Sequence, residues 1–248
     1  MNLLFRLAYK GTRYGGFQVQ PNAPTVCAAF QDALQAVTGT RPDVKGCSRT
    51  DAGVHALDFA LSLRYDGPVP PQKLVLALNA HLPSDIRVKS ARPVPEDFHA
   101  RYAAHAKTYC YRIRNSAIDD PFDLDTCWRT AGRLDLAAMQ AAAARFVGTH
   151  DFRAVRSVGT ETRTTVRTVY YFDVERRGDL ISCRVCANGF LYNMVRAMVG
   201  TIVYAAEGKL SPADIPAILD SGNRTLAGPT VPPGGLYMTN LWYDEDVL

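Results

Sequence analysis

Apolar and polar residues alternate with a period of two in several short stretches of the chain. In the first of them, Leu3, Phe5 and Leu7 are separated by Leu4 and Arg6. A period of two is typical of a strand with one buried face. Strands are predicted on this basis over 3–9, 59–65, 109–114, 164–174, 180–185 and 236–243. The two stretches on either side of Arg177-Gly178 predict a hairpin.

Helical periodicity separates these strands. The clearest helix follows Thr25, whose hydroxyl can cap its first turn, and ends at Gly39. Pro70-Pro71 suits the start of a short helix over 72–80. Ser211-Pro212 opens another, with Asp214 in the position that completes a cap. Two more helices are predicted over 134–146 and 190–207.

This order of elements predicts an α+β protein. Strands and helices alternate loosely in both halves of the chain, with antiparallel hairpins among them, which suggests two related halves with mostly antiparallel sheets. We expect an N-terminal half at 1–104 and a C-terminal half at 105–248. No repeat of fixed period and no low-complexity linker marks the join.

The composition is that of an ordinary soluble protein with a mild positive charge. Hydrophobic residues make up 47% of the 248 residues and charged residues 21%, as in ordinary globular proteins. The formal net charge is +4, and 22 of the 28 basic residues are arginine. Arginine grips phosphate through a planar fork and stacks on bases, which suits an RNA-binding protein. A genome rich in G and C explains the arginine content equally well.

Cysteine usage and hydropathy point to a cytoplasmic protein. The six cysteines are scattered, so we expect reduced thiols. Cys183 and Cys186 form one CxxC, but no second pair accompanies it, and on a strand residues three apart point to opposite faces. A structural role is therefore favoured over a metal site. No signal peptide begins the chain, and the apolar stretch at 190–206 is too short and too polar to cross a bilayer.

One segment between predicted strands concentrates reactive groups. Residues 46–56 place Arg49, Asp51 and His55 close together, and small residues flank Asp51 on both sides. Gly53 allows unusual backbone angles and the close approach of a ligand. A loop held by a rigid sheet commonly displays a catalytic group. Taken alone, however, Asp51 and Gly53 are also simply good turn residues.

The sequence of this segment resembles the signature of a known enzyme family. The stretch from Ser48 to Ala56, SRTDAGVHA, resembles the signature of the TruA family of pseudouridine synthases. Further blocks resemble the family in the same order along nearly the whole chain. They lie at 9–18, 78–86, 97–101, 107–111, 190–196 and 234–237.

The resemblance implies both an architecture and an activity. It implies two similar halves around a central cleft with helices on the outer face, and a homodimer that binds tRNA in the cytoplasm. It implies an isomerase that converts uridines 38, 39 and 40 of the anticodon stem-loop to pseudouridine. The reaction involves no redox change and no hydrolysis, so no cofactor and no metal is expected.

Three residues correspond to the family's catalytic groups. Asp51 would be the nucleophile, since a carboxylate can attack carbon and leave again. Arg196 would pair with it. Arg196 is the single charge in the predicted helix between Phe190 and Ala206, where an unpaired charge is costly. The alternative for Arg196 is a helix-edge residue whose stem covers apolar surface.

Tyr109 corresponds to the tyrosine that stacks on the target base. Its ring can hold a flipped uracil and its hydroxyl can help remove the C5 proton. Pattern alone does not separate Tyr109 from Tyr111, because the two share a strand face and either could be core.

Substrate-binding residues follow from the same resemblance. Arg49 and Arg101 correspond to arginines that contact tRNA, and Arg49 could occupy the place that the flipped base leaves. Two segments would lie against the RNA: Asp97, Phe98, His99, Ala100 and Arg101, and the loop of Gly159, Thr160, Glu161, Thr162 and Arg163. The alternative for any one arginine is an ordinary solvated charge. For His55 we expect a hydrogen-bonded structural role and no catalytic step.

Two other function classes remain open at this stage. A non-catalytic RNA-binding module would not need Asp51. An Asp-dependent hydrolase of nucleosides would need a second acidic or metal-binding group beside Asp51, and no such pairing is visible in the sequence.

Overall fold

The chain folds into two compact units. The computed structural model describes residues 1–157 and 162–244. The N-terminal unit comprises Met1–His105 together with Tyr237–Leu248, and the C-terminal unit comprises Ala106–Leu236. The expected C-terminal half, 105–248, thus includes a last segment that returns to the N-terminal unit. It returns because strand β10 (Leu236–Trp242) pairs in parallel with β3 (His55–Arg64).

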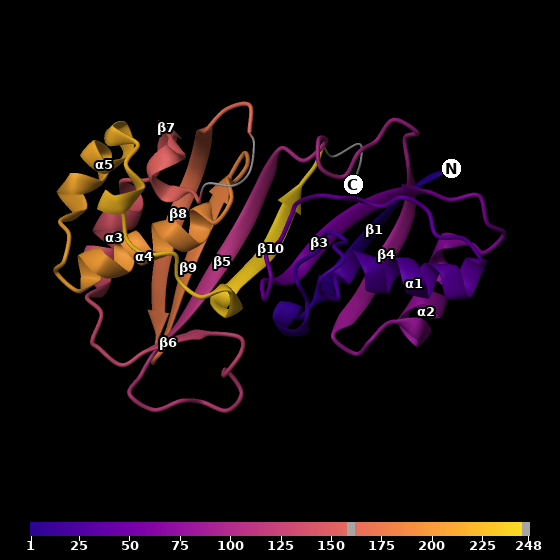
Figure 1. Cartoon of the computed structure of the whole chain (residues 1–248), viewed down its shortest axis with the longest axis horizontal. Coiled ribbons are helices and arrows are strands. Elements are labelled where there is room, and N and C mark those ends of the chain that lie inside the picture. Colours follow the sequence, from indigo (N-terminus) through magenta and orange to yellow (C-terminus); the bar gives the residue numbers. More distant parts are fainter. Residues whose placement is uncertain (158–161, 245–248) are drawn as a thin grey trace. The chain divides into compact units, whose positions relative to one another are not determined.

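The N-terminal unit is built on a mostly antiparallel sheet. Its strands run in the order β4 (Ile86–Val94), β1 (Asn2–Tyr9), β3 and β10, and the short β2 (Lys45–Gly46) also pairs with β3. Strand β1 is antiparallel to both neighbours, with Leu4 opposite Ser62 on one side and Arg92 on the other. The central strand is therefore hydrogen-bonded on both edges (Figure 1).

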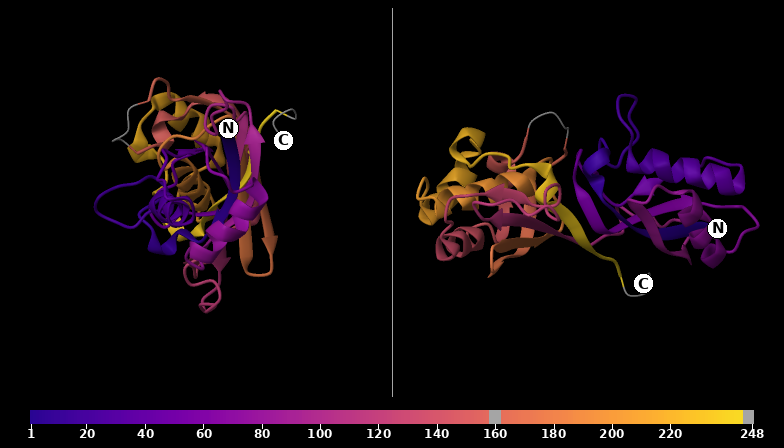
Figure 2. Two further views of the ribbon diagram at one scale, coloured as in Figure 1. Left: turned by 90° about the vertical axis from the view of Figure 1, so that its right-hand side faces the viewer. Right: turned by 90° about the horizontal axis from the view of Figure 1, so that it is seen from below.

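Two helices cover one face of this sheet. Helix α1 (Val26–Thr38) is capped by the Thr25 hydroxyl, which accepts from the Ala28 N–H at 3.2 Å, and ends at Gly39 with φ +74°. Helix α2 (Pro71–His81) packs against α1 and β4. Phe30 of α1 meets Phe5 of β1 edge to face at 5.4 Å, so the side chain of Phe5 points toward α1. Figure 2 shows both helices on one side of the sheet.

The C-terminal unit repeats this arrangement with a longer hairpin. Its strands run in the order β5 (Ala106–Asn115), β9 (Leu180–Ala187), β8 (Val166–Arg177) and β7 (Gly148–Asp151), all antiparallel, while β6 (Trp128–Thr130) lies parallel to β5. Gly178, with φ +58°, turns the predicted hairpin between β8 and β9. The α+β class predicted from the sequence is confirmed.

Three helices belong to this unit. Helices α3 (Leu136–Ala144) and α4 (Met194–Ala206) pack together on one face of its sheet, α3 against β8 and α4 against β5 (Figure 2). Helix α5 (Ile215–Ser221) follows the 3₁₀ turn η3 (Pro212–Asp214), where Ser211 and Asp214 form the predicted capping box. Further 3₁₀ turns are η1 (Gly11–Arg13), η2 (Phe152–Val155), η4 (Arg224–Leu226) and η5 (Pro233–Gly235).

The element predictions were wrong or incomplete at several places. The helix expected over 190–207 begins only at Met194, because Asn193 has φ +59° and interrupts the helical backbone. The short strands β2, β6 and β7 were missed, and so was strand β4. Its apolar positions alternate irregularly, it contains Pro93, and the register to β1 shifts between Arg6 and Leu7.

The CxxC lies on β9, as the pattern predicted. Cys183 and Cys186 are both buried. Within residues 1–157 and 162–244, no group of three or more His, Cys, Asp or Glu side chains is placed to hold a metal ion. Over the same residues, no helix combines the length and the apolar character that crossing a bilayer demands.

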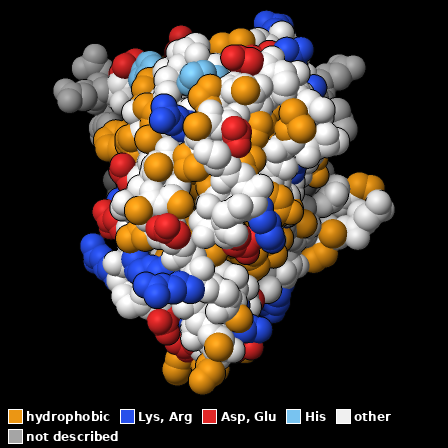
Figure 3. Space-filling model, turned by 90° about the vertical axis from the view of Figure 1, so that its left-hand side faces the viewer, with side chains coloured by type: hydrophobic (Ala, Val, Ile, Leu, Met, Phe, Trp, Pro, Cys, Tyr) orange, Lys and Arg blue, Asp and Glu red, His pale blue; other side chains and the backbone are white. Residues whose placement is uncertain are grey.

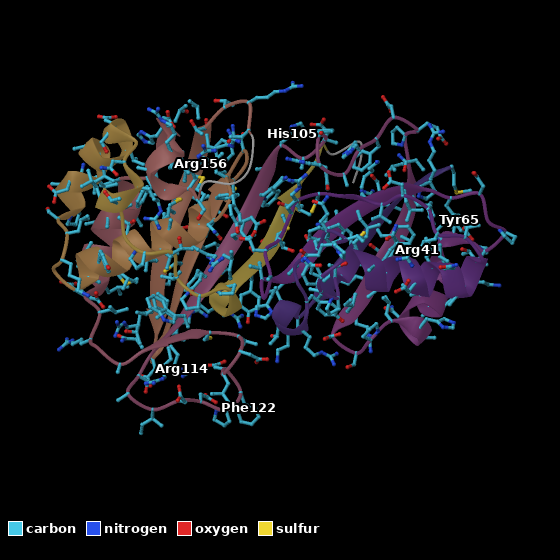
Figure 4. The ribbon with its side chains drawn as sticks, in the orientation of Figure 1. Arg41, Tyr65, His105, Arg114, Phe122 and Arg156 are labelled. Carbon is cyan, nitrogen blue, oxygen red and sulfur yellow. The ribbon has the colours of Figure 1, made fainter. Side chains whose placement is uncertain are left out.

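A long connection between β5 and β6 exposes apolar side chains. Phe122 is 90% exposed on this segment, and Ile118 and Leu124 are exposed as well (Figure 4). Arg114 at the end of β5 forms ion pairs with Asp120 at 3.2 Å and with Asp123, so charges of the segment's own anchor it to the sheet.

Charge is mixed on the face of the C-terminal unit drawn in Figure 3. Basic and acidic side chains lie interspersed there, among apolar ones. An RNA-binding surface needs concentrated positive charge. Charges of both signs are present on this face.

Candidate active site

Asp51 lies in the loop that joins β2 to β3, and main-chain hydrogen bonds hold the loop on both sides of it. The Thr50 carbonyl accepts from the Phe17 N–H at 3.2 Å, and the Gly53 N–H donates to the Tyr14 carbonyl at 3.2 Å. Both bonds lead to the segment that follows β1. The loop is thus fixed by a second, distant stretch of chain, and the Asp51 side chain is partly exposed.

The backbone turns sharply directly after Asp51. The Asp51 carbonyl accepts from the Val54 N–H at 3.1 Å, which closes a four-residue turn. Gly53, the third residue of this turn, has φ +77°, a conformation that glycine adopts without steric cost. Asp51 and Gly53 therefore do form a turn, as their residue types suggested.

Glycines before the loop permit very close packing. A Cβ atom on Gly11 would lie 1.9 Å from the Val54 carbonyl oxygen, and one on Gly16 would lie 2.4 Å from that of Thr50. Real Cβ contacts are never so short, so any side chain at Gly11 would push the Asp51 loop away.

His55 is a structural residue. It is 1% exposed, and its Nδ1 accepts the Gly11 N–H at 2.9 Å. Since Nδ1 accepts, the ring carries its proton on Nε2. The ring also lies 4.7 Å from that of Tyr237. His55 is thus hydrogen-bonded, as expected.

Asp85 secures the Tyr14 segment from the side of β4. Its carboxylate accepts from the Tyr14 hydroxyl at 2.7 Å and from Arg13 Nε at 2.8 Å. Burial raises the pKa of Asp85, but these hydrogen bonds outweigh burial and hold the pKa below its ordinary value. Burial together with Asp85 raises the pKa of Tyr14 to about 12. A chain of contacts thus runs from Asp85 through Tyr14 to Gly53 in the Asp51 loop.

Arg196 projects from the first turn of α4 and is held by two acceptors. Its Nε donates to the Val231 carbonyl at 2.7 Å and its Nη1 donates to Asn193 Oδ1 at 2.6 Å. Asn193 in turn donates through Nδ2 to Ser157 Oγ at 2.9 Å. The guanidinium is therefore positioned by hydrogen bonds and does not simply lie along apolar surface, which was the alternative.

The segment that supplies the Val231 carbonyl is itself pressed against α4. A Cβ atom on Gly200 would lie 1.9 Å from the Pro229 carbonyl oxygen. The Thr201 hydroxyl donates to the Ala197 carbonyl and accepts the Gly228 N–H at 3.0 Å. Close glycine packing therefore fixes one of the two acceptors that orient Arg196.

The structure separates the two tyrosines on β5. Tyr111 is fully buried and donates to the Pro232 carbonyl at 2.7 Å. Burial raises the pKa of Tyr111, and the charge of Arg196 opposes this in part. Tyr109 is 5% exposed, and its ring meets that of Phe190 edge to face at 5.1 Å. Tyr111 is thus a core residue whose hydroxyl is used structurally.

Of residues 97–101, which are predicted to bind RNA, some pack against the fold and others are exposed. Ala100 is fully buried, its N–H donates to Ser62 Oγ at 3.1 Å and its carbonyl accepts from the Tyr243 hydroxyl at 2.8 Å. Phe98 packs against the Tyr243 ring at 5.4 Å. Asp97 and Arg101 are exposed.

His99 and Arg101 sit beside further aromatic and basic groups. The His99 ring lies 4.4 Å from that of Tyr102, and the Arg101 guanidinium lies 5.8 Å from the centre of the same Tyr102 ring. Burial lowers the pKa of His99, and the nearby charge of Lys45 lowers it further. Arg49, in the Asp51 loop, is also exposed. Positive charge therefore accompanies these segments of the N-terminal unit.

The second predicted RNA-binding segment is described only in part. Gly159, Thr160 and Glu161 lie outside the described residues. Thr162 is exposed and its hydroxyl donates to the Thr164 carbonyl at 2.9 Å, while Arg163 is exposed.

Sequence reasoning missed the groups that hold the candidate catalytic residues. Asn193 and the Val231 carbonyl orient Arg196, and Tyr14 and Asp85 support the Asp51 loop. One signal was available for Asn193, because asparagine tolerates the left-handed conformation and its position just before an apolar helix marks a helix start.

Comparison with known proteins decides the family. The family model described as tRNA pseudouridine synthase matches residues 7–103 and 142–244, more than half of the chain, and these ranges include both Asp51 and Arg196. The chain belongs to the tRNA pseudouridine synthase family. Tyr109 lies between the two matched ranges.

Similar members of the tRNA pseudouridine synthase family match almost end to end. A protein named tRNA pseudouridine synthase A from Thermoanaerobacter sp. (strain X514) is 43% identical over 242 residues, covering 98% of this chain and 99% of its own. Its namesake from Citrifermentans bemidjiense is 42% identical over 245 residues, covering 98% of each chain.

Among solved structures, a chain from "Crystal Structure of a Cbf5-Nop10-Gar1 Complex" matches with a TM-score of 0.40 and 12% identity. The match covers 97% of this chain and 59% of that one. A likeness at this level carries no argument about function.

Proposed function

We propose that this protein is a tRNA pseudouridine synthase, an isomerase that converts uridine to pseudouridine in tRNA with Asp51 as its nucleophile. The observation that carries the proposal is the display of Asp51, the acidic residue of the SRTDAGVHA segment, on a turn clamped by main-chain hydrogen bonds to Tyr14 and Phe17. Membership of the family and near-full-length identity to enzymes of that name support it.

The isomerisation breaks the C1′–N1 bond of uridine and forms a C1′–C5 bond to the same base. C5 loses its proton and N1 gains one, so the reaction balances without any co-reactant. A carboxylate suits the first step, since it can attack carbon and leave again. Asp51 acts either by adding to the ribose or by assisting elimination to a glycal.

Arg196 would keep Asp51 ionised and aligned. A guanidinium has five N–H donors, and the bonds to Val231 and Asn193 use two of them. These bonds fix the guanidinium, and its planar fork of donors suits a carboxylate. An arginine–carboxylate pair favours the charged form that attack on carbon requires.

Tyr109 would stack on the uracil and assist loss of the C5 proton. Its contact with Phe190 fixes the plane of the ring. An aromatic face gives a flipped base the stacking that it loses on leaving the helix.

Arg49, the 97–101 segment and the 159–163 loop would contact the RNA. Phe98 and Ala100 anchor their segment through Tyr243 and Ser62, which leaves Asp97 and Arg101 at the surface. An anchored backbone with an exposed arginine can present charge to phosphate at little entropic cost.

The resemblance to the TruA family supports three finer proposals. The targets are uridines 38, 39 and 40 of the anticodon stem-loop, the protein acts as a homodimer, and it works in the cytoplasm without a cofactor. Light scattering of the purified protein tests the dimer, with a mass near twice 27.2 kDa expected.

The activity itself is tested with an unmodified tRNA transcript tritiated at uracil C5. We expect tritium release to the solvent in the presence and in the absence of a chelator. Carbodiimide mapping of the product RNA is expected to place pseudouridine at positions 38 to 40. Tight tRNA binding without any tritium release would overturn the proposal and favour the RNA-binding module.

A further inference from the structure

The backbone of Asn193 is in the left-handed region of φ/ψ space. Among the described residues it is the only one besides glycine with a positive φ, at +59°. A residue with a Cβ enters this region at a cost of about 1 kcal/mol or more, although asparagine tolerates it better than most. Such a conformation persists where the surroundings fix it, and at this position it lies three residues before Arg196.

The conformation places the Asn193 side chain between two polar partners. Arginine only donates, so the oxygen of the amide faces Arg196 Nη1, at 2.6 Å, and the nitrogen faces Ser157 Oγ, at 2.9 Å. The chemistry of the partners thus settles the orientation of the amide. The Ser157 N–H also donates to the Tyr192 carbonyl at 3.0 Å, which fixes Ser157 beside the start of α4.

We propose that Asn193 is the positioning residue for Arg196, with Ser157 as its support. The proposal rests on the proposed function, in which Arg196 acts on Asp51. Without the Asn193 oxygen, the guanidinium would keep its Nε bond to Val231 but lose the Nη1 bond that helps to fix its plane. Asn193 therefore acts on catalysis through Arg196 and does not touch the substrate.

The same contacts link the start of α4 to a segment with a proposed RNA role. Ser157 lies two residues before Gly159, the first residue of that segment, and directly follows Arg156, which Figure 4 labels in the C-terminal unit. The hydrogen bond from Asn193 to Ser157 therefore connects the start of α4 to a residue that is close in sequence to that segment.

The decisive variant is Asn193→Gly, which separates the side chain from the backbone. Glycine adopts a positive φ without strain, so the helix start is preserved while both side-chain hydrogen bonds are lost. Loss of a hydrogen bond to a charged group predicts a fall in kcat of about 10- to 100-fold, with tRNA affinity within about threefold of wild type. Ser157→Ala, which leaves the Asn193 oxygen in place, is expected to lower kcat by only about threefold.

Two controls distinguish positioning from a structural role. Asn223→Gly also removes two side-chain hydrogen bonds, those that the Asn223 oxygen accepts from the Thr225 N–H and hydroxyl in the same unit, and is expected to leave kcat unchanged. In an Arg196→Lys background, Asn193→Gly is expected to cost little more, because the group that it positions is already gone.

The measurement is single-turnover tritium release from tRNA, with tRNA affinity and thermal stability measured on the same proteins. A wild-type kcat for Asn193→Gly, or additive losses with Arg196→Lys, would overturn the inference while the proposed function stands. Failure of the wild-type protein to release tritium would instead overturn the proposed function.

Discussion

At the scale of single residues, the candidate site combines groups that act with groups that hold them. Asp51, Arg196 and Tyr109 carry the proposed chemistry, and each is fixed by a contact that is not adjacent in the chain. Tyr14 holds the loop of Asp51, the Val231 carbonyl holds Arg196, and Phe190 meets the ring of Tyr109. Preorganised groups of this kind lower the reorganisation that the reaction requires.

The hydroxyl of Tyr109 is predicted to matter separately from its ring. Tyr109→Phe keeps the ring contact with Phe190 and the stacking face but removes the proton-transfer group. We expect kcat for tritium release to fall by about 10²-fold or more, since general acid–base groups contribute on that order, while tRNA binding stays unchanged. Filter binding and single-turnover release measure the two effects. Equal rates for Tyr109→Phe and wild type would leave Tyr109 only a stacking role.

Asp85 makes a prediction about pH and stability. Hydrogen bonds from Tyr14 and Arg13 hold its pKa below the ordinary value of about 3.9. A lowered folded-state pKa stabilises the fold above about pH 4, and this stabilisation is lost as the pH falls through the folded pKa. Asp85→Asn is therefore expected to cost about 1.5 kcal/mol of unfolding free energy at pH 7 and clearly less at pH 3.

Urea unfolding of wild type and Asp85→Asn at the two pH values measures this difference. The side chain of Asp85 is 12% exposed and that of Arg13 is 68% exposed, so the partly buried Tyr14 bond is expected to contribute more than the Arg13 bond. A difference that is the same at pH 3 as at pH 7 would show that the charge of Asp85 does not stabilise the fold.

At the scale of elements, α4 and the segment 228–231 behave as one packed body. Gly200 allows the Pro229 carbonyl to approach, and Thr201 bonds Gly228. The same segment ends at Val231, which accepts from Arg196. Packing between two stretches of chain thus determines the direction of a proposed catalytic side chain.

Gly200→Ala is predicted to disturb both stability and catalysis. The new Cβ would lie 1.9 Å from the Pro229 carbonyl oxygen, so the segment must move and Val231 with it. We expect a loss of about 2 kcal/mol in unfolding free energy and a lower kcat. Gly132→Ala, where a Cβ meets no atom within 4 Å, is the matched control and should change neither quantity. Wild-type stability for Gly200→Ala would contradict the packing described here.

Local signals account for most of the elements that the sequence predicted. Thr25 caps α1, Gly39 ends it, and Ser211 with Asp214 forms a capping box, because each of these acts within a few residues of its own position. The start of α4 was misplaced because Asn193 leaves the helical region for contacts with Ser157 and Arg196. Ser157 is 36 residues away in the chain, so no periodicity reveals it.

In the candidate site too, local features could be predicted from the sequence, whereas contacts between distant segments could not. The SRTDAGVHA motif identified Asp51 by resemblance, and the turn around it followed from Gly53. Support from Tyr14 and Asp85 comes from segments separated by 71 residues in sequence, and only the folded chain shows it. Both tyrosines of β5 are buried, and the bond from the Tyr111 hydroxyl to the Pro232 carbonyl gives Tyr111 a structural role, whereas alternation along the strand treated the two alike.

At the scale of the whole molecule, two units of related architecture each contribute part of the proposed machinery. The N-terminal unit carries Asp51 and Arg49, and the C-terminal unit carries Tyr109 and Arg196. The last strand, β10, returns to pair with β3 directly beside His55, so the fold of the N-terminal unit includes both ends of the chain. We expect the Asp51 loop to depend on this strand for its stability.

The central claim is that Asp51 is the nucleophile of a uridine isomerase, and tritium release by Asp51→Asn tests it most directly. The variant keeps the size of the side chain and removes its nucleophilic charge. We predict that release falls by at least about 10⁴-fold, with tRNA affinity within about threefold of wild type. Asp32→Asn, at a carboxylate 67% exposed on α1, should release tritium at the wild-type rate. Release by Asp51→Asn at a rate close to wild type would contradict the account.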